Sequence, residues 1–318
     1  MTAGRGRGKA KPLRTYSLGK RKSLVGQRDA GGVVPAGASF AEWFDSLPDI
    51  LAGRDIRLLA AAVVSARRRR RQVVAAMGAH VIKCGLSPLV VSLMEEGIIT
   101  AVALNGAGAI HDFELAWAGA TSEEVGPALE DGSFGMARET ADFLNGAAVT
   151  ASRDGVGFGE SLGRLIAGEK LPNGGTSILA AGARTGVPVT VHVALGTDII
   201  HMHPSASGAA IGESSLADFH RLAECVARLE GGVYLNIGSA VVLPEVFLKA
   251  LALARNRREG KPRRFTTANL DFLPHYRPLQ NVVRRPTTVG GRGYQIIGHH
   301  EIVLPLLFTA VREGLKGR

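Results

Sequence analysis

The hydrophobic positions follow two alternating rhythms over most of the chain. Short, nearly continuous apolar runs end at Gly, Asn or Ser; they are "QVVAAMG" (72–78), "ITAVALN" (99–105), "VPVTVHVALG" (187–196) and "VYLNIGS" (233–239). Between them lie segments with apolar residues at helical spacing, among them 87–97, 106–119, 215–232 and 244–256. Strands of this kind alternating with helices are typical of a parallel sheet covered on both faces. The pattern predicts an α/β protein with a parallel sheet.

Local signals place the ends of several elements. Ser39 followed by Glu42 is a capping box and predicts a helical start to the body of the protein. Pro88 in the first turn and Gly97 at the end bound the helix over 87–97. The five arginines at 67–71 follow an Ala/Val-rich helical segment, and we interpret them as a charged helix end. Near the C-terminus, 263–271 and 294–300 are expected to be strands and 302–314 the closing helix.

The charge is distributed unevenly along the 318 residues. The net charge of +10 is concentrated in the first 28 residues, which hold nine Lys or Arg and no Asp or Glu; the rest carries 29 against 28. A basic, Gly-rich segment is typical of a flexible tail, with contact to nucleic acid through the tail as the alternative. We therefore expect a tail over residues 1–34, and the remaining residues could form one large α/β domain or two smaller ones.

The remaining composition narrows the setting. Two distant cysteines and no C-x-x-C give no disulfide framework or zinc knuckle, and they fit a reducing compartment. No apolar run reaches the length of a transmembrane helix, and the N-terminus lacks the apolar region of a signal peptide. These features favour a cytoplasmic protein without a membrane span.

Small, polar and imidazole side chains gather where the expected strands end. In a parallel sheet the carboxyl ends of the strands share one edge, where ligands bind. The residues at this edge are Gly78, Ala79 and His80; Asn105, Gly106, Ala107 and Gly108 with His111 and Asp112; Gly196, Thr197 and Asp198 with His201 and His203; Gly238 and Ser239; Thr267, Ala268, Asn269 and Asp271; and His299, His300 and Glu301.

Gly-rich turns at this edge favour a dinucleotide. "NGAGAIHD" follows a strand and opens a helix, where backbone N–H groups bind phosphate, although it lacks the spacing of G-x-G-x-x-G. A plain tight turn is the alternative for this motif taken alone, and "GGRG" at 290–293 is weaker still. Several Gly-rich strand ends together predict a dinucleotide site.

The histidines leave a metal site open as an alternative. "HMHP" has the H-x-H spacing with which a strand points two imidazoles the same way, so His201 and His203 could bind a divalent metal with His299. His111, Asp112 and Glu301 could complete the set. Hydrogen bonding to a cofactor, or capping, is the other interpretation. Lys83 is expected to pair with a carboxylate or phosphate rather than to form a Schiff base, and Cys84 to be a small packing residue.

Several segments together resemble the deoxyhypusine synthase family. They are 78–113, "TTANLD" (266–271), "IIGHHEIVLPLL" (296–307) and "YSLGKRKSLV" (16–25), and they keep the order of the family's segments. The resemblance implies a single α/β domain over residues 35–318 with a Rossmann-like parallel sheet. It also implies a homotetramer with NAD at subunit interfaces, and amine transfer after oxidation of a polyamine. By position it implies that NAD contacts Ala79, His80, Lys83, Gly85, Asn105, Gly106, Ala107, Gly108, Gly238, Ser239, Thr267 and Ala268; Asp198, just past a strand, is expected to join them.

The sequence also departs from this family. Where the family carries its catalytic lysine before the last strand, this chain has "TTVGGRGYQ", with no lysine and no tryptophan. Arg277, Arg284, Arg285 and Arg292 replace the carboxylates expected for a polyamine, which suggests a neutral or anionic ligand. We expect an NAD-dependent transferase or oxidoreductase acting on an amine-type small molecule other than the hypusine lysine.

The candidate catalytic groups follow from this expectation. His111 or His299 would act as the base and Lys83 would be the reserve for covalent catalysis. The alternatives are a metal-dependent enzyme and a non-catalytic nucleotide-binding protein.

Overall fold

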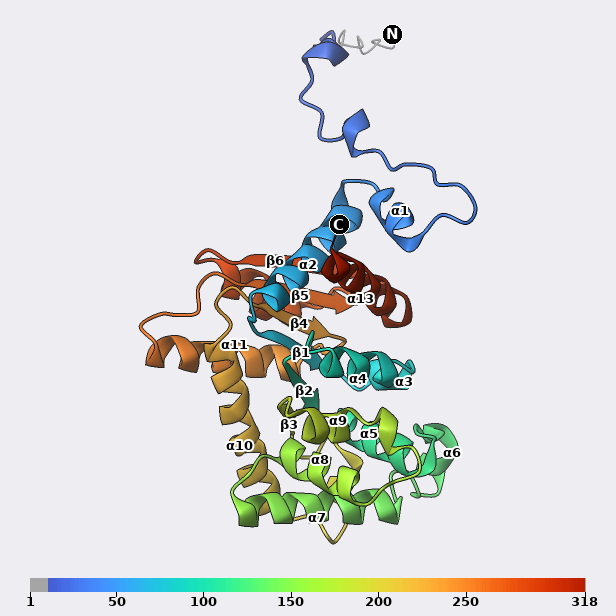
Figure 1. The fold of residues 1–318 in the computed structure, drawn as a ribbon, viewed down its shortest axis with the longest axis vertical. Helices are drawn as coiled ribbons and strands as arrows, with labels where there is room; N and C mark the ends of the chain where they lie inside the picture. The colour runs from blue at the N-terminus through green and yellow to red at the C-terminus, as the bar shows by residue number, and fades with distance from the viewer. Residues whose placement is uncertain (1–10, 318) are drawn as a thin grey trace, which may run out of the picture.

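Six parallel strands form the centre of the protein. The computed structural model describes residues 11–317 (Figure 1). The sheet has the order β3-β2-β1-β4-β5-β6, and every neighbouring pair is parallel. Its strands are β1 (Val73–Met77), β2 (Ala101–Asn105), β3 (Val189–His192), β4 (Val233–Ile237), β5 (Thr266–Asp271) and β6 (Arg292–Ile297). The chain builds one half outward from β1 and then crosses back to β4, so the strand order reverses between these two neighbours.

Alternate residues of each strand face opposite layers of the protein. Val73, Ala75 and Met77 belong to the larger of two hydrophobic cores, whereas Val74 and Ala76 belong to the smaller one. A strand that is buried on both faces needs apolar residues at every position. This requirement explains the continuous apolar runs in the sequence, and the expected fold class is confirmed.

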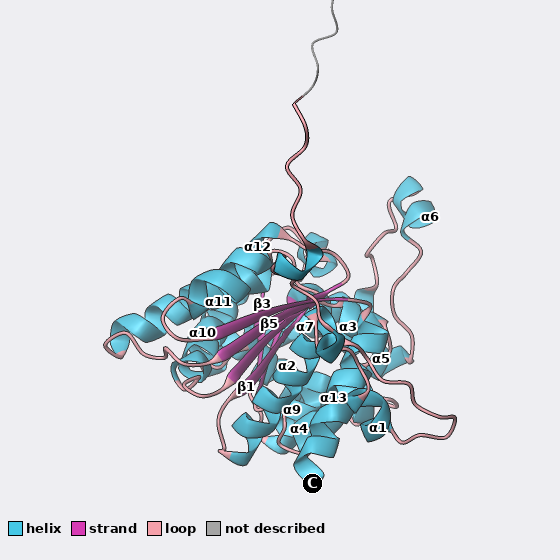
Figure 2. Ribbon diagram, turned by 90° about the horizontal axis from the view of Figure 1, so that it is seen from above, coloured by secondary structure: helices cyan, strands magenta, loops and turns pink. Residues whose placement is uncertain are grey.

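Helices cover both faces of the sheet (Figure 2). Residues in the larger core come from α2 (Leu51–Arg68), α3 (His80–Lys83), α4 (Ser87–Glu95), α5 (Gly106–Ala118), α7 (Arg138–Asp154), α8 (Phe158–Gly168), α9 (Ile178–Thr185) and α13 (His300–Lys316). The smaller core packs under α10 (Gly208–Ala227) and α11 (Val242–Arg257). The remaining helices are α1 (Phe40–Asp45), α6 (Val125–Glu130) and α12 (Tyr276–Pro278).

The helix signals read from the sequence are present in the structure. The Ser39 hydroxyl accepts the N–H of Glu42 at 3.3 Å, and the Glu42 carboxylate accepts the N–H of Ser39 at 2.7 Å, which is the expected capping box. Pro88 lies in the first turn of α4, and Gly97 has a φ of 64° just beyond its end. α2 ends at Arg68, inside the arginine run, as expected for a charged helix end.

The expected tail falls partly outside the described residues. Residues 1–10 lie outside them, and residues 11–34 are exposed apart from Asp29 and Val34, with two 3₁₀ turns at Leu18–Lys20 and Gln27–Asp29. The N–H of Gly32 donates to the carbonyl of Ser46 at 2.8 Å, so the end of this segment contacts the body. The domain boundary near residue 34 stays a prediction. Within residues 11–317, no helix combines the length and apolar character needed to cross a bilayer.

Candidate functional site

A cavity of about 730 Å³ opens beside the carboxyl ends of β1 and β2. Lys83 from α3, His111 and Glu114 from α5, and Asp198 after β3 all line it. Phe113, Ile110 and Ile199 supply apolar wall. A cavity of this size with a few convergent polar groups is typical of a small-molecule site. Lys83, His111, Ala107 and Asp198, all expected at the site from the sequence, come together here.

A hydrogen-bonded relay fixes the imidazole of His111. Its Nδ1 lies 2.6 Å from the hydroxyl of Thr121, and that hydroxyl donates to the Glu114 carboxylate. The other Glu114 oxygen accepts from Thr140 at 3.1 Å. Because the Thr121 proton is given to Glu114, the Thr121 oxygen accepts from His111, which places the proton on Nδ1. The remaining nitrogen, Nε2, then carries the lone pair of a base.

Burial keeps this histidine neutral. Desolvation lowers the pKa of His111, the nearby Glu114 charge raises it in part, and Lys83 lowers it further. A neutral imidazole with a fixed tautomer can accept a proton near neutral pH.

Carboxylates outnumber cations in the cavity wall. Glu114, Glu123, Glu139 and Asp198 line it together with Lys83. Among residues 11–317, no ion pair within 4.0 Å joins a carboxylate to the ammonium group of Lys83, and pairing with a phosphate stays a prediction. Lys83 is exposed and lines this acidic cavity.

Asp198 closes the N-terminus of α5. Its carboxylate accepts the N–H of Ala107, and the side chain of Asn105 accepts the N–H of Gly108 at 2.9 Å. Burial raises the pKa of Asp198 to about 6. A Cβ at position 106 would overlap the Asp198 carboxylate, so Gly106 makes room for this contact. These N–H groups are the ones that we expected to receive phosphate.

The second oxygen of Asp198 has no partner. It lies 4.0 Å from Nε2 of His201, which is also buried without a hydrogen bond. Nδ1 of His201 accepts the N–H groups of Gly196 and Asp198, at 3.2 and 3.3 Å, so its proton is on Nε2. A small movement or one bridging water would pair the two atoms.

The turn after β1 packs against the turn after β4. A Cβ on Gly78 would overlap the carbonyl of Gly238, and Gly238 itself has a φ of 63°. Ser239 caps α11 by accepting the N–H of Leu243 at 3.2 Å. Ala79, His80, Gly238 and Ser239 thus flank the point at which the strand order reverses, which in such sheets is the usual ligand crevice.

Three of the expected site residues lie elsewhere. Thr267 and Ala268 do not follow a strand; both are buried inside β5, and the Thr267 hydroxyl donates to Val282 at 2.7 Å. Asp112 is not available as a metal ligand, because its carboxylate accepts hydrogen bonds from Ser177 and from two N–H groups at the start of α9. Thr267 and Ala268 therefore belong to the buried interior of β5, and Asp112 serves as a helix cap.

The metal set based on H-x-H does not form. His201 lies inside a 3₁₀ turn over Ile199–Met202 and His203 follows the turn, so strand spacing does not apply. Nε2 of His203 lies 2.8 Å from the carbonyl of Gly135. His299 lies at the start of α13, exposed, with its ring 6.1 Å from that of Phe272. Among residues 11–317, the one set of three close metal-ligand donors is His80, Cys84 and Glu301.

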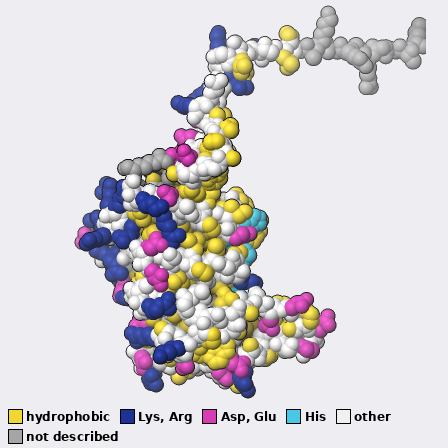
Figure 3. All heavy atoms as spheres, turned by 45° about the vertical axis from the view of Figure 1, so that its right-hand side comes forward, with side chains coloured by type: hydrophobic (Ala, Val, Ile, Leu, Met, Phe, Trp, Pro, Cys, Tyr) yellow, Lys and Arg dark blue, Asp and Glu magenta, His cyan; other side chains and the backbone are white. Residues whose placement is uncertain are grey.

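This last cluster was missed by the sequence reasoning. His80 and Cys84 are one helical turn apart, a spacing that was visible, but Glu301 comes from the other end of the chain. Figure 3 shows histidine and carboxylate side chains side by side on the surface of the body. The cluster lies next to Lys83 but does not line the cavity that contains His111.

Comparisons with known proteins give a fold but no family. No protein-family model and no curated protein matches the chain. A candidate LOR/SDH protein from Methanococcus maripaludis S2 is similar in structure, with a TM-score of 0.55 at 15% identity over 92% of this chain and 75% of that one. AgrE, solved with ornithine and NAD+, gives 0.53 at 13% identity, and this chain covers 83% of its own length but only 33% of AgrE.

The expected family is also among the structural neighbours. A candidate deoxyhypusine synthase from Entamoeba histolytica gives a TM-score of 0.50 at 10% identity, covering 86% of this chain and 93% of that one. Similarity at this identity extends to the Rossmann-like fold and no further.

Proposed function

We propose that the protein is an NAD-dependent enzyme that acts on an amine-type small molecule bound beside α5. The observation that carries this proposal is the His111–Thr121–Glu114 relay in a cavity at the carboxyl edge of a Rossmann-like sheet. Structural similarity to a protein solved with NAD+ and ornithine, itself an amine, supports the same class. Membership of the deoxyhypusine synthase family remains part of the proposal.

The charges in the cavity favour a cationic ligand. Four carboxylates face one ammonium in its wall. The arginines that suggested an anionic ligand do not line it; Arg277 pairs with Glu245 at 3.6 Å, and Arg285 donates to Asn281 at 2.7 Å. Arg292 begins β6, at the opposite edge of the sheet. An ammonium group would therefore be attracted to the cavity.

His111 would serve as the base in this cavity. Its Nε2 would take a proton from the amine nitrogen, while the carbon that bears the amine gives up its hydride and the relay to Glu114 stabilises the imidazolium that forms. Bound NAD would supply a hydride acceptor. Lys83, which is exposed and lines the cavity, is the reserve for an imine with a carbonyl product.

The dinucleotide fits one of the two Gly-rich turns better than the other. The N–H groups at the start of α5 are taken by Asp198 and Asn105, and a phosphate there would face the Asp198 carboxylate. Ala79, Gly238 and Ser239 lie at the reversal of strand order, and within residues 11–317 no side chain caps the start of α3. We assign the pyrophosphate to the surface of these two turns, with Asn105, Gly106, Ala107 and Gly108 as wall.

The test is dinucleotide binding followed by turnover of a panel of primary amines. Calorimetry with NAD should show binding, and absorbance at the NADH band should rise with at least one amine. His111→Gln should lower kcat by roughly 10²- to 10⁴-fold, the usual contribution of a general base, with NAD affinity unchanged. His220→Gln, at an exposed histidine of α10, is the matched control and should keep full activity.

Two results would remove this proposal. One is the absence of NAD binding at millimolar concentration, and the other is turnover that His111→Gln leaves intact. Native mass spectrometry of the protein as purified would test the proposed homotetramer and any retained dinucleotide in one measurement.

A further inference from the structure

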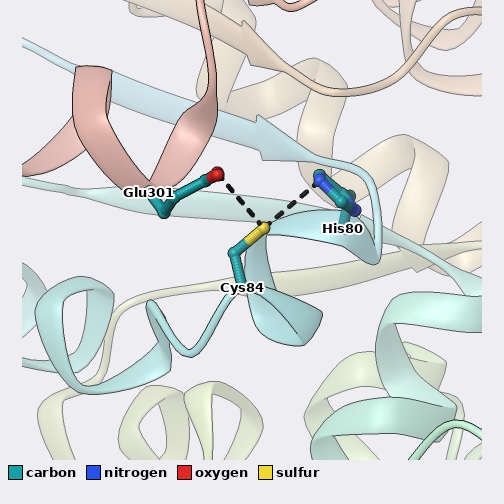
Figure 4. Close-up of side chains that lie close together, drawn as sticks. All are labelled: His80, Cys84 and Glu301. Atoms are coloured by element: carbon teal, nitrogen blue, oxygen red, sulfur yellow. Dashed lines mark hydrogen bonds between the residues drawn. The ribbon is translucent and has the colours of Figure 1, made fainter.

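Three donors of different chemistry meet at the start of α13. His80 and Cys84 lie on one side of the α3 turn, whose register is fixed by the Cys84 N–H donating to the His80 carbonyl at 2.9 Å. Glu301 is the second residue of α13 and comes toward them from the end of β6 (Figure 4). Sγ of Cys84 lies 3.2 Å from Nε2 of His80 and 3.6 Å from Oε2 of Glu301.

These separations match the edges of a zinc tetrahedron. With Zn–S near 2.3 Å and Zn–N or Zn–O near 2.1 Å, tetrahedral angles place the donors about 3.6 Å apart. All three ligand atoms here lie within 4.8 Å of one another. Shifts of well under an ångström in exposed or half-buried side chains would bring them onto one ion.

The three donors already contact one another without an ion. Sγ of Cys84 pairs with Nε2 of His80 and donates to a carboxylate oxygen of Glu301. A divalent ion bound to the same three groups would replace the thiol proton, because the thiolate is the form that binds a metal.

We propose that His80, Cys84 and Glu301 bind a divalent transition-metal ion, zinc by preference. A thiolate with an imidazole and a carboxylate suits zinc far better than magnesium or calcium, which select oxygen ligands. Three protein donors leave the fourth position for water or an oxygen or nitrogen atom of a ligand. The cluster itself begins directly after β1, beside the point where the strand order reverses.

The neighbours of the cluster agree with a bound ion. The ring of buried His300 lies 5.4 Å from the ring of His80, centre to centre; its Nε2 donates to the Leu270 carbonyl, and its Nδ1 has no partner. The ring of Phe272 also lies beside His80, at 5.7 Å. A base and an aromatic wall therefore lie beside the three donors, as is usual around a metal with an open position.

This inference does not rest on the proposed function. The metal would use the side chain of His80, whereas the dinucleotide would use the backbone of the same turn, so both can be present. Metal binding is to be measured in the absence of NAD, and NAD binding is to be measured on protein from which metal has been removed with a chelator. The two results are then independent, so either proposal can be disproved without the other.

The test uses the full chain, stripped with a chelator and titrated with zinc chloride. Calorimetry should give one zinc per chain, and cobalt(II) should produce a thiolate-to-metal absorption band. Cys84→Ser, His80→Gln and Glu301→Gln should each weaken zinc binding by at least roughly tenfold, and Cys84→Ser should abolish the cobalt band. Cys225→Ser, at the other free cysteine, is the control and should change neither readout.

Alkylation separates a metal ligand from a reactive thiol. Zinc should slow the modification of Cys84 by iodoacetamide, measured by peptide mass spectrometry. Glu301→Gln changes an exposed side chain, so its fold, checked by circular dichroism, should be intact. Less than about a tenth of a zinc per chain, or affinity unchanged by Cys84→Ser and Glu301→Gln, or alkylation at one rate with and without zinc, would overturn the proposal.

Discussion

The turns after β1 and β2 occupy equivalent places in the fold and differ in chemistry. Each leaves the carboxyl end of an inner strand and enters a helix beneath the same core. After β2, the free N–H groups of α5 are taken by Asn105 and Asp198. After β1, the side chains of His80, Cys84 and Glu301 meet and pair with one another.

The difference shows that turns at equivalent positions in the fold can be closed, with protein groups on the N–H groups that a ligand would use, or open to a ligand. Protein oxygens take two of the N–H groups at the start of α5, which leaves fewer donors for a ligand. The four-residue α3 has little N-terminal charge to offer, so the chemistry of its turn comes from side chains. The proposed ligand positions are therefore at the β1 turn, and the β2 turn would be a wall that carries His111, the proposed base.

The largest expected effect is that of Gly106→Ala. The new Cβ would overlap the Asp198 carboxylate and push it off the α5 N-terminus. Overpacking and the lost cap together should lower the free energy of unfolding by about 2–4 kcal/mol, measured by urea denaturation. Gly126→Ala, in the exposed helix α6 with no atom within 4 Å, should be neutral or stabilise by up to about 1 kcal/mol.

A double variant identifies the cause. If the clash with Asp198 is the source, then Asp198→Ala should reduce the cost of Gly106→Ala by about 1 kcal/mol or more. Strictly additive losses would mean that the β2 turn is not closed by this carboxylate.

The second-largest expected effect is the pH dependence of the stability that Asp198 contributes. Burial raises the pKa of Asp198 from 3.8 to about 6, so the folded protein holds a proton that the unfolded chain releases. The associated stability is full below about pH 4 and is lost as pH rises through 6. Asp198→Asn has no proton to lose at this position. Its free energy of unfolding, relative to that of the wild type, should therefore rise by up to about 3 kcal/mol between pH 4 and pH 7.5.

Denaturation of both proteins at several pH values measures this gain. Asp142→Asn, on an exposed position of α7, controls for the removal of a carboxylate. A stability difference between Asp198→Asn and wild type that is the same at pH 4.5 and pH 7.5 would contradict a raised pKa of Asp198.

The strands were predictable because burial on both faces leaves a local signature. Val73–Met77 and Val233–Ile237 are apolar at nearly every position, and the sequence places them within a residue or two. The limits appeared where contacts are distant. "HMHP" was assigned strand spacing, yet Ile199–Met202 forms a 3₁₀ turn after Asp198, whose side chain is held by the start of α5.

The candidate site was only partly predictable for the same reason. His111 and Lys83 were expected at the site from their places after β2 and β1, but the relay through Thr121 depends on a loop that returns to α5. Cys84 looked like a packing residue because Glu301 is 217 positions away, and that pairing depends on how α13 crosses the sheet. Local sequence patterns indicate where helix turns and strand ends lie. Contacts between side chains from different elements can be identified only once the fold is known.

The smallest expected change in the free energy of unfolding is that of a substitution in the β1 turn. Gly85 has a φ of 74°, and the Cβ that alanine would add there meets no atom within 4 Å. Gly85→Ala should therefore lose only the backbone term, about 1 kcal/mol of unfolding free energy. Gly85→Asn should cost less, because asparagine tolerates this conformation. Zinc affinity should change little, since the proposed ligands His80 and Cys84 precede Gly85. A loss as large as that of Gly106→Ala, in urea denaturation, would mean that the β1 turn is packed as tightly as the β2 turn, and the contrast between an open and a closed turn would fail.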